Sequence, residues 1–335
     1  MADDRKRPEQ PRAEKVLPGV WRLRLPLPWP GVPHGNVWAV AAQGGVVLFD
    51  TGIGGKGGLR RFDIALAQAG FGLEDVRLLV CTHSHTDHYG LAAPIVAGAG
   101  CELWMHPAWP HVRLLADDPA AALEQRIEAA RQSGVPMAAL ERYRASREGD
   151  DDNGIDAIVE PDRDLVPGVE VETDLGAWQV YETPGHAPSH VVLHQPKRKL
   201  MISGDHLLGR TVLFFDHGHS PDPVGEFLRS LDEVEPLEVD LVLPGHGRTF
   251  RDPKAKIAEA RRQVGELLGK VREALAGGER TGFEIVGEII GSENLNTPVS
   301  AWVLQIVLSC LDHLTIIGEV TPVEGSDPRR WVLAG

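Results

Sequence analysis

The order of apolar and polar positions predicts alternating strands and helices in the first third of the chain. Residues 21–27 alternate as a half-buried strand does, and residues 36–52 hold two apolar runs about a Gly–Gly turn, which predicts a hairpin. Residues 57–70 have helical spacing that ends at a glycine, and the apolar run at 76–82 predicts a buried strand. A second helix and strand follow over 90–106. We therefore expect antiparallel strands first, and then strands that alternate with helices.

The pattern then changes to a polar, alanine-rich and acidic stretch at 107–164, which predicts a helical insertion. A helix at 223–234 and a strand at 239–247 complete the main region near residue 252. The two strand-rich halves on either side of the insertion are expected to form two stacked sheets. Four strands are predicted in the second half, at 168–174, 178–185, 190–196 and 199–205.

Both ends of the chain differ from this main region. The charged, proline-containing start predicts a disordered tail. The predicted divisions are a tail at 1–14, a main domain at 15–252 and a C-terminal domain at 253–335. The C-terminal domain is expected to contain a long helix at 253–278, further helices at 281–291 and 297–314, and a two-stranded wing at 316–335.

Composition narrows the class of protein. Among 335 residues, 42% are hydrophobic and 24% charged, and because no apolar run approaches the ~20 residues of a membrane-spanning helix, we expect no membrane span. No apolar segment of the kind found in secretory signals follows the charged start, so a cytoplasmic location is expected. The odd number of cysteines, Cys81, Cys101 and Cys310, favours buried thiols over disulfides. The net charge of −14 disfavours nucleic acid as a partner.

Histidines and aspartates gather where the predicted apolar strands end. They occur in "FDTG" at Asp50, in "CTHSHTDH", "ETPGHAPSH" and "ISGDH", and in "LVLPGHG". Strand ends on one edge of a sheet converge in space, so ligands on these loops can meet at one point of a rigid scaffold. Imidazole and carboxylate suit zinc and also iron or manganese. The pattern therefore predicts a site for a first-row divalent metal ion that needs no cysteine ligand.

Four of these motifs, "THSHTDH", "PGHAPSH", "SGDHLL" and "LPGHG" in that order, resemble the metallo-β-lactamase fold hydrolases. The resemblance covers about residues 15–252. It implies an α/β fold, the αββα sandwich, with a site for two metal ions at the sheet edge. It further implies that Asp50 supports the site through hydrogen bonds to the ligand-bearing loops. By the same resemblance, His83, His85 and His186 hold the first metal, Asp87, His88 and His246 hold the second, and Asp205 bridges the two.

The spacing of the first motif supports this division. In H-x-H the alternating backbone directs both imidazoles to one side, so His83 and His85 can bind a single ion, whereas the adjacent Asp87 and His88 point in different directions. Two ions ~3.5–4 Å apart can ionise a water between them near neutral pH, and this metal-bound hydroxide is the expected nucleophile. Asp87 can accept its proton. The protein is therefore expected to be a metal-dependent hydrolase.

The carboxylate at Asp205 reduces the number of reactions to be considered. In the resembling family, lactam-cleaving enzymes generally lack it, whereas thioester, lactone and phosphodiester hydrolases usually have it. A lactonase is disfavoured because Leu208 occupies a position where such enzymes typically have tyrosine. Thioester cleavage, of an acyl-glutathione or acyl-coenzyme A type substrate, is the leading prediction because a thiolate leaves without obligatory protonation. His190 and His206 are the candidate proton donors, although an outer hydrogen-bonding role is favoured for both.

Several alternatives remain open. The C-terminal region resembles the winged-helix appendage of the lactamase-like 2 group, which includes RNA-cleaving enzymes, so a phosphodiesterase or endoribonuclease is the second hypothesis. A DNA-binding regulator is disfavoured because the helix at 297–314 has no Lys or Arg. The insertion is predicted to form a lid, with a contact between two copies in a homodimer as the alternative. A loop at the pocket mouth is predicted for His217 and His219, an exposed loop for His34, and no functional role for His111.

Overall fold

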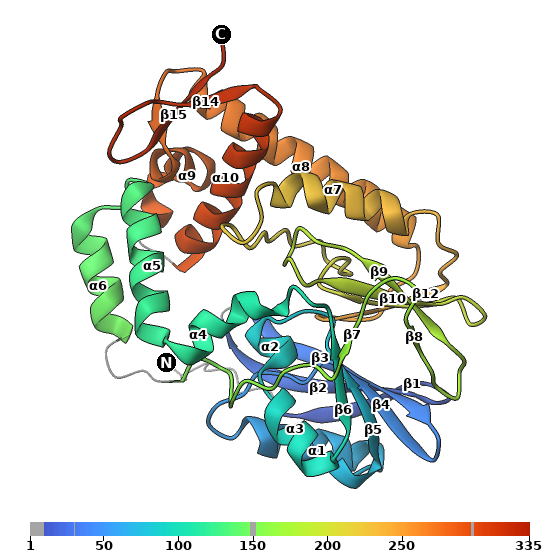
Figure 1. Cartoon of the computed structure of the whole chain (residues 1–335). Coiled ribbons are helices and arrows are strands. Elements are labelled where there is room, and N and C mark those ends of the chain that lie inside the picture. Colours follow the sequence, from blue (N-terminus) through green and yellow to red (C-terminus); the bar gives the residue numbers. More distant parts are fainter. Residues whose placement is uncertain (1–9, 30, 148–151, 296–297) are drawn as a thin grey trace, which may run out of the picture.

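Two β-sheets face each other in the main region of this computed structural model (Figure 1), which describes residues 10–29, 31–147, 152–295 and 298–335. The first sheet begins as an antiparallel meander and continues as parallel strands joined through helices. This is the succession that the apolar pattern predicts. Its strands, in spatial order, are β1 (Arg12–Leu17), β2 (Val20–Trp29), β3 (Val32–Ala42), β4 (Gly45–Phe49), β5 (Val76–Val80), β6 (Glu102–Met105) and β7 (Arg163–Asp164).

The second sheet is antiparallel except for one parallel pair, β11 and β12, which α7 (Pro223–Val234) connects. Apolar side chains from both sheets fill the space between them, and Phe49 packs on Trp178 with ring centroids 5.6 Å apart. Burial on both sides explains why these strands are almost continuously apolar. In spatial order the strands are β12 (Leu241–Pro244), β11 (Leu200–Gly204), β10 (Val191–Gln195), β9 (Trp178–Glu182) and β8 (Glu170–Val171).

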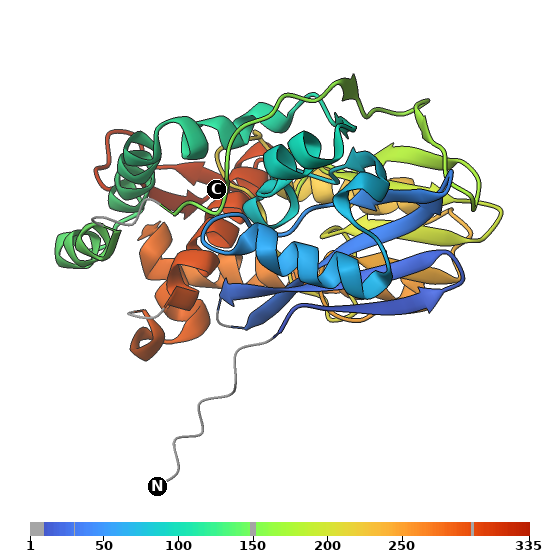
Figure 2. The ribbon, with the colours of Figure 1, turned by 90° about the horizontal axis from the view of Figure 1, so that it is seen from below.

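Helices cover the outer face of each sheet. Figure 2 shows α1 (Gly58–Ala69) and α3 (Ala92–Ala99) over the first sheet, against which they bury Phe62 and Ile95. On the second sheet, α7 and α8 (Pro253–Leu275) pack with Leu231 among their buried side chains. The layers are therefore helix, sheet, sheet and helix, which confirms the predicted αββα sandwich.

The C-terminal region continues the outer core of the second sheet. Helix α8 packs on the main region and also on the helices that follow, so a single apolar cluster joins both parts. The classification of this region as winged-helix-like stays a prediction. After α8 come β13 (Arg280–Thr281), α9 (Gly282–Ile290), α10 (Pro298–Ile316), β14 (Val320–Pro322) and β15 (Arg330–Leu333), with a small antiparallel sheet in the order β13, β15, β14.

Helix α10 corrects the expectation that no apolar run is long enough to cross a membrane. Its segment Val299–Ile316 has a mean hydropathy of 1.5 and is, within the described residues, the one helix that passes this test of length and composition. Leu304, Val307 and Leu311 of α10 are buried in the cluster shared with α7 and α8. Because a core helix of a soluble protein passes the same test, we treat α10 as a packed helix.

Two predicted boundaries fall inside edge strands, whose largely exposed and polar residues show no alternating apolar pattern. The tail predicted at 1–14 overlaps β1, which pairs with β2 from Arg12 onward, while residues 1–9 lie outside the described part. The insertion predicted to end at 164 includes β7, which pairs with β6. The helices of the insertion are α4 (Arg113–Asp117), α5 (Pro119–Gln132) and α6 (Met137–Arg147).

Candidate metal centre

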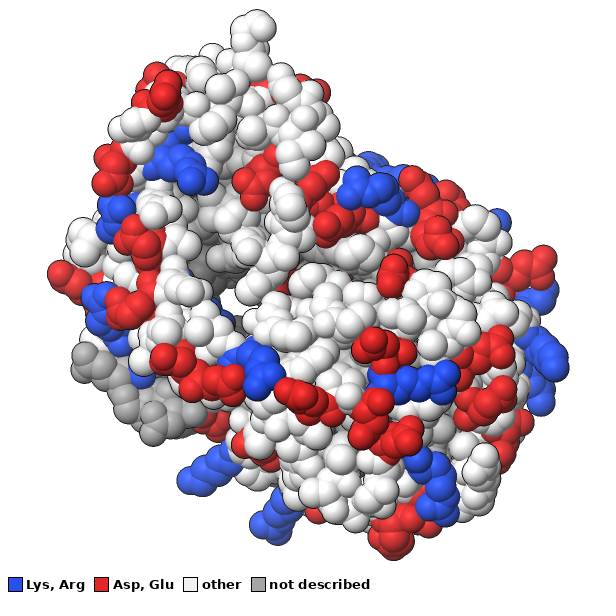
Figure 3. All heavy atoms as spheres, viewed as in Figure 1, with Lys and Arg blue, Asp and Glu red and all other residues white. Residues whose placement is uncertain are grey.

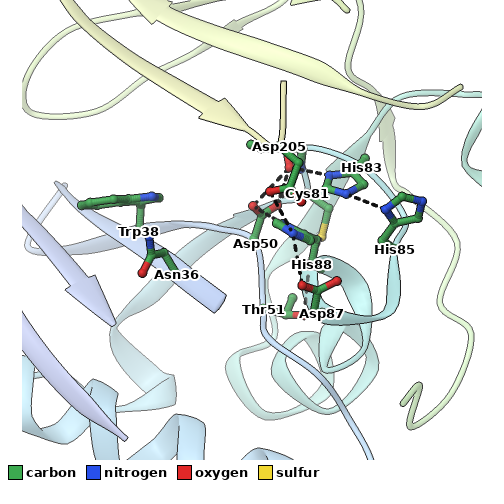
Figure 4. A network of polar contacts seen from close by, with 12 residues as sticks. Asn36, Trp38, Asp50, Thr51, Cys81, His83, His85, Asp87, His88 and Asp205 are labelled. Atoms are coloured by element: carbon green, nitrogen blue, oxygen red, sulfur yellow. Dashed lines mark hydrogen bonds and ion pairs between the residues drawn. The ribbon is translucent and has the colours of Figure 1, made fainter. Parts of the chain in front are cut away.

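The four loops that carry the predicted ligands, and a fifth that carries Asp50, meet at one edge of the sandwich. Asp50 follows β4, the His83–His88 segment follows β5, and Asp205 and His246 follow β11 and β12, whereas His186 lies between β9 and β10. Backbone hydrogen bonds tie the loops together, among them Gly245 N–H to the Gly204 carbonyl at 2.7 Å. The carboxyl ends of the two parallel strand pairs therefore supply most of the centre (Figure 4).

Three imidazoles form the first group of candidate ligands. His85 Nδ1 lies 3.1 Å from His83 Nε2 and 3.1 Å from His186 Nε2. Bare imidazole nitrogens this close to one another can all face a single cation. The structure thus brings together the three histidines that the family resemblance assigned to the first metal.

The second group combines one carboxylate with two imidazoles. His246 Nε2 lies 3.1 Å from Asp87 Oδ2, and His88 Nε2 lies 3.5 Å from the same oxygen. Asp205 lies between the two groups, because its Oδ2 is 3.2 Å from His246 Nε2 and 3.7 Å from His186 Nε2. This is the position predicted for a bridging ligand.

The chemistry of these atoms fits bound cations. His88 Nε2 and Asp205 Oδ1 lie 3.5 Å apart, both are buried, and neither has a hydrogen-bond partner in the described structure. Such atoms are costly to bury unless a cation or a donor satisfies them. A Cβ at position 245 would collide with Asp205 Oδ1, so glycine is needed there for the two ligand loops to approach. Seven nitrogen and oxygen ligands without sulfur suit first-row divalent ions.

Outer hydrogen bonds fix the orientation of the ligands. Asp50 accepts a hydrogen bond from His88 Nδ1 at 2.8 Å and another from the Thr82 backbone N–H at 2.7 Å. These bonds stabilise Asp50 in a left-handed conformation, φ 67°, that non-glycine residues rarely adopt. His246 Nδ1 donates to the His34 carbonyl at 3.0 Å. The two contacts through Nδ1 leave Nε2 of His88 and of His246 directed toward the centre, as in other metal sites.

The first sheet also holds the His246 loop, which belongs to the second sheet. Asn36 donates from its side chain to the Pro244 carbonyl at 2.9 Å and to the Gly247 carbonyl at 3.0 Å, and Trp38 Nε1 donates to Pro244 at 3.1 Å. The position of His246 therefore depends on the packing of both sheets.

Comparison with known proteins agrees with this geometry. The family model described as the metallo-beta-lactamase superfamily matches residues 30–246, a range that holds all seven candidate ligands. The chain belongs to the metallo-β-lactamase superfamily. A relative from Bacillus subtilis, the "Probable metallo-hydrolase YqjP", is 25% identical over 278 residues, which are 80% of this chain and 83% of the relative. The chain is accordingly a metal-dependent hydrolase that binds divalent metal.

Two crystal structures share the architecture of this metallo-β-lactamase superfamily member over nearly its whole length. The family protein TTHA1429 from Thermus thermophilus superposes with a TM-score of 0.80 at 24% identity and covers 95% of this chain and 100% of its own. A beta-lactamase domain protein from Burkholderia ambifaria gives a TM-score of 0.81 at 29% identity over 96% of this chain and 94% of its own. The fold similarity thus extends well beyond residues 30–246.

The two ligand groups of this superfamily member differ in charge. Burial and the neighbouring imidazoles lower the pKa of His83 well below its ordinary value, and burial with His85 lowers the pKa of His186 to about 3. Burial would also lower the pKa of His88, but Asp87 and the other nearby carboxylates outweigh it and raise the pKa to about 9. Without metal, His83 and His186 of the first group are therefore neutral near pH 7, whereas His88 of the second group holds a proton.

His190 and His206 take outer positions, as the sequence favoured. His190 Nε2 accepts the backbone N–H of Asp205 at 3.0 Å, and its Nδ1 lies 2.8 Å from Thr183 Oγ1. His206 is buried, with its ring centroid 5.1 Å from that of Phe227. Burial lowers the pKa of His190 well below the ordinary value and that of His206 to about 3, so both imidazoles are neutral near pH 7.

Two residues near the centre were missed by sequence reasoning. Asp216 Oδ2 lies 3.4 Å from His85 Nε2 and 3.7 Å from His111 Nε2, and these three side chains form a further potential ligand group. His111 also approaches Ser84 Oγ at 3.0 Å. The sequence feature that could have indicated Asp216 is its place directly before the motif "HGH". In that motif His217 pairs instead with Asp312 of α10 at 3.0 Å.

Asp216 is expected to position His85 for metal binding. The substitution Asp216→Ala removes the carboxylate that faces His85 Nε2, and loss of such an outer partner typically costs about 10- to 100-fold in metal affinity. Competition with a fluorescent chelator would measure this loss directly. The matched control is Asp312→Ala. Asp312 lies on α10 and pairs with His217, which is not a candidate ligand. Equal metal affinities in the two variants would contradict the role assigned to Asp216.

Proposed function

We propose that this superfamily member hydrolyses a thioester and holds two divalent metal ions, preferably Zn²⁺, in its two ligand groups. The observation that carries the proposal is the Asp205 carboxylate between both groups. By the resemblance drawn from the sequence, this carboxylate is characteristic of thioester, lactone and phosphodiester hydrolases, and lactam-cleaving enzymes generally lack it. The proposed first group is His83, His85 and His186, the proposed second group is Asp87, His88 and His246, and Asp205 is shared.

Each protein group has a chemical task in this proposal. A bound pair of divalent cations supplies activation of water near neutral pH and polarisation of an acyl carbonyl. Burial opposes ionisation of Asp87, but His88 and His246 outweigh it and lower the pKa, so its carboxylate is ionised and can accept a proton. Asp205 is likewise held ionised by His246, His88 and His186 and balances positive charge in the centre.

The leaving group favours thioesters over oxygen esters and amides. An amine or alkoxide normally needs a proton donor as it departs, whereas a thiolate does not. His190 is engaged on both ring nitrogens, and the neutral His206 packs against Phe227. Neither of the donors considered from the sequence is therefore placed to protonate a leaving group.

Cleavage of RNA is the alternative, and the charges of α8 count against it. Its basic side chains would have to meet phosphates, yet Arg261 pairs with Asp232 and Glu235, and Arg272 pairs with Glu319. Figure 3 shows acidic and basic side chains interspersed on the viewed face, without a continuous basic patch. A small acyl thioester is accordingly the favoured substrate class, with glutathione and coenzyme A both open as the thiol carrier.

A panel of acyl thioesters and single-stranded RNA tests this function. Zinc- or manganese-loaded protein is expected to release thiol from acyl-glutathione or acyl-coenzyme A, which a thiol reagent detects, and to leave the RNA intact on a gel. Asp87→Ala should show no turnover. Cleavage of RNA without release of thiol would replace the proposal with a phosphodiesterase, and RNA would then be expected to dock on α8.

A further inference from the structure

An aromatic pair leads from the metal centre to the C-terminal region. The ring centroid of Phe214 lies 5.8 Å from that of His85 and 5.6 Å from that of His186. On its other side, Phe214 packs on Trp302 of α10, with centroids 4.7 Å apart. Two ligand histidines are therefore connected to α10 through Phe214.

Trp302 is held in place, yet a large part of its indole reaches the surface. Its Nε1 donates to the Leu213 carbonyl at 3.3 Å, while 39% of the residue is exposed. Val212, in the same loop as Phe214, is 43% exposed. Exposed aromatic surface beside other apolar groups is characteristic of ligand contacts, since the polar end of the indole is already satisfied.

The insertion is joined to the C-terminal region by hydrogen bonds and an ion pair. The end of α5 is tied to the C-terminal region because Arg329 N–H donates to the Gln132 carbonyl at 2.8 Å and Phe283 N–H donates to the Ser133 carbonyl at 2.9 Å. Arg131 also pairs with Asp327 at 2.8 Å. Figure 3 shows the surface hollowed between the insertion and the C-terminal region, with mostly uncharged atoms around the hollow.

We propose that Phe214 and Trp302 form the subsite for the acyl group, and that the substrate carries an apolar acyl group larger than acetyl. This inference rests on the proposed thioester hydrolysis. With the acyl carbonyl at the metal centre, the chain would leave along the Phe214 ring toward Trp302. Each methylene buried in this way raises affinity roughly fourfold, so several methylenes give a strong preference.

The first test compares acyl groups of different length on one small thiol carrier, which is the same for every substrate. With thioesters of N-acetylcysteamine, kcat/KM is expected to be roughly 10- to 100-fold higher for octanoyl than for acetyl. Trp302→Ala should reduce this ratio by about tenfold, and Trp302→Phe, which keeps a ring but loses the bond to Leu213, should fall between. Ile316→Ala is the matched control, because Ile316 is an exposed apolar residue, 57% accessible, at the other end of α10. An unchanged ratio in folded Trp302→Ala protein, or no preference for octanoyl, would overturn the inference.

A binding measurement separates this inference from the proposed function. The thioether S-octyl-N-acetylcysteamine cannot be hydrolysed, and titration calorimetry should show that it binds the metal-loaded protein at least about tenfold more tightly than the S-methyl compound. Trp302→Ala should remove this difference. If the difference is found but no thioester is cleaved, the apolar subsite stands and thioester hydrolysis fails. If thioesters are cleaved but the two thioethers bind equally, hydrolysis stands and the subsite fails.

Discussion

Asp205→Asn is expected to reduce kcat for hydrolysis by more than about 100-fold, beyond the range typical of outer partners of metal ligands. Asparagine keeps the shape of the side chain but removes the negative charge that lies between His246 and His186. Two cations held close together repel each other, and the carboxylate between them offsets this repulsion. Steady-state kinetics with the preferred thioester would measure the loss.

The metal content of the same variant tests the bridging position. Mass spectrometry of the purified protein should find fewer metal ions per chain in Asp205→Asn than in the unsubstituted protein. Asp164→Asn serves as the control, because Asp164 is an exposed aspartate of β7. If Asp205→Asn kept both full activity and full metal content, the carboxylate would have neither role.

The candidate ligands could be predicted because each ligand group is largely local in the sequence. His83, His85 and His88 lie in one six-residue segment, whose end forms the short helix α2 (Thr86–Tyr89), and "PGHAPSH" and "LPGHG" each follow or precede an apolar strand. The strand pattern then determines which edge these loops share, since parallel neighbours end on the same side. These local motifs, together with the family resemblance that they carry, therefore contained most of the information on the centre.

Asp216 and His111 could not be found in this way. They lie more than 100 positions apart, in a loop before α7 and in the insertion, and their contact depends on how those segments pack. The spacing of His217 and His219 matches that of His83 and His85, but His217 faces Asp312 of α10. A two-residue spacing only predicts that two imidazoles lie on one side of the backbone, and tertiary packing decides what they face.

The basic side chains of α8 are a second case in which the sequence could not show what the side chains face. The Lys and Arg residues of this helix could meet an anionic partner, although a solvated helix face is the default interpretation of such a run. In the structure Arg261 pairs with carboxylates of α7 and its C-terminal end, and Arg272 pairs with Glu319 before β14. Because these partners are distant in the sequence, the run of basic residues alone could not exclude an anion-binding surface.

Removal of bound metal with a chelator is expected to abolish activity and to lower the melting temperature by roughly 10 °C. Metal that binds only the folded protein stabilises it by about 4 kcal/mol at a free concentration 1,000 times the dissociation constant, and a chain of this size loses a few degrees per kcal/mol. Differential scanning calorimetry before and after chelation would measure the shift. Separate additions of zinc, manganese and iron would then identify the metal that restores activity.

The metal-free protein is expected to have a free energy of unfolding that depends on pH in both directions. The pKa of His88 rises from 6.5 to about 9, because Asp87 and other carboxylates outweigh the effect of burial. Its stabilising contribution is therefore complete below about pH 6.5 and is lost as the pH rises through 9. Burial lowers the pKa of His186 to about 3, so its contribution is complete above pH 6.5 and is lost as the pH falls toward 3. Stability should thus be greatest near pH 6.5.

Bound metal should reverse the dependence of the free energy of unfolding on pH above about pH 6.5. Because His88 must lose its proton before Nε2 can bind a cation, metal affinity should increase with pH between about 6.5 and 9, and binding at pH 7 should release protons. Titration calorimetry in two buffers with different ionisation enthalpies would count them, and urea unfolding of metal-free protein at pH 6.5 and 8.5 would follow stability. A gain in stability of the metal-free protein from pH 6.5 to 8.5 would contradict this. It would mean that the carboxylates around His88 do not keep a proton on its imidazole, so that His88 is neutral before metal binds.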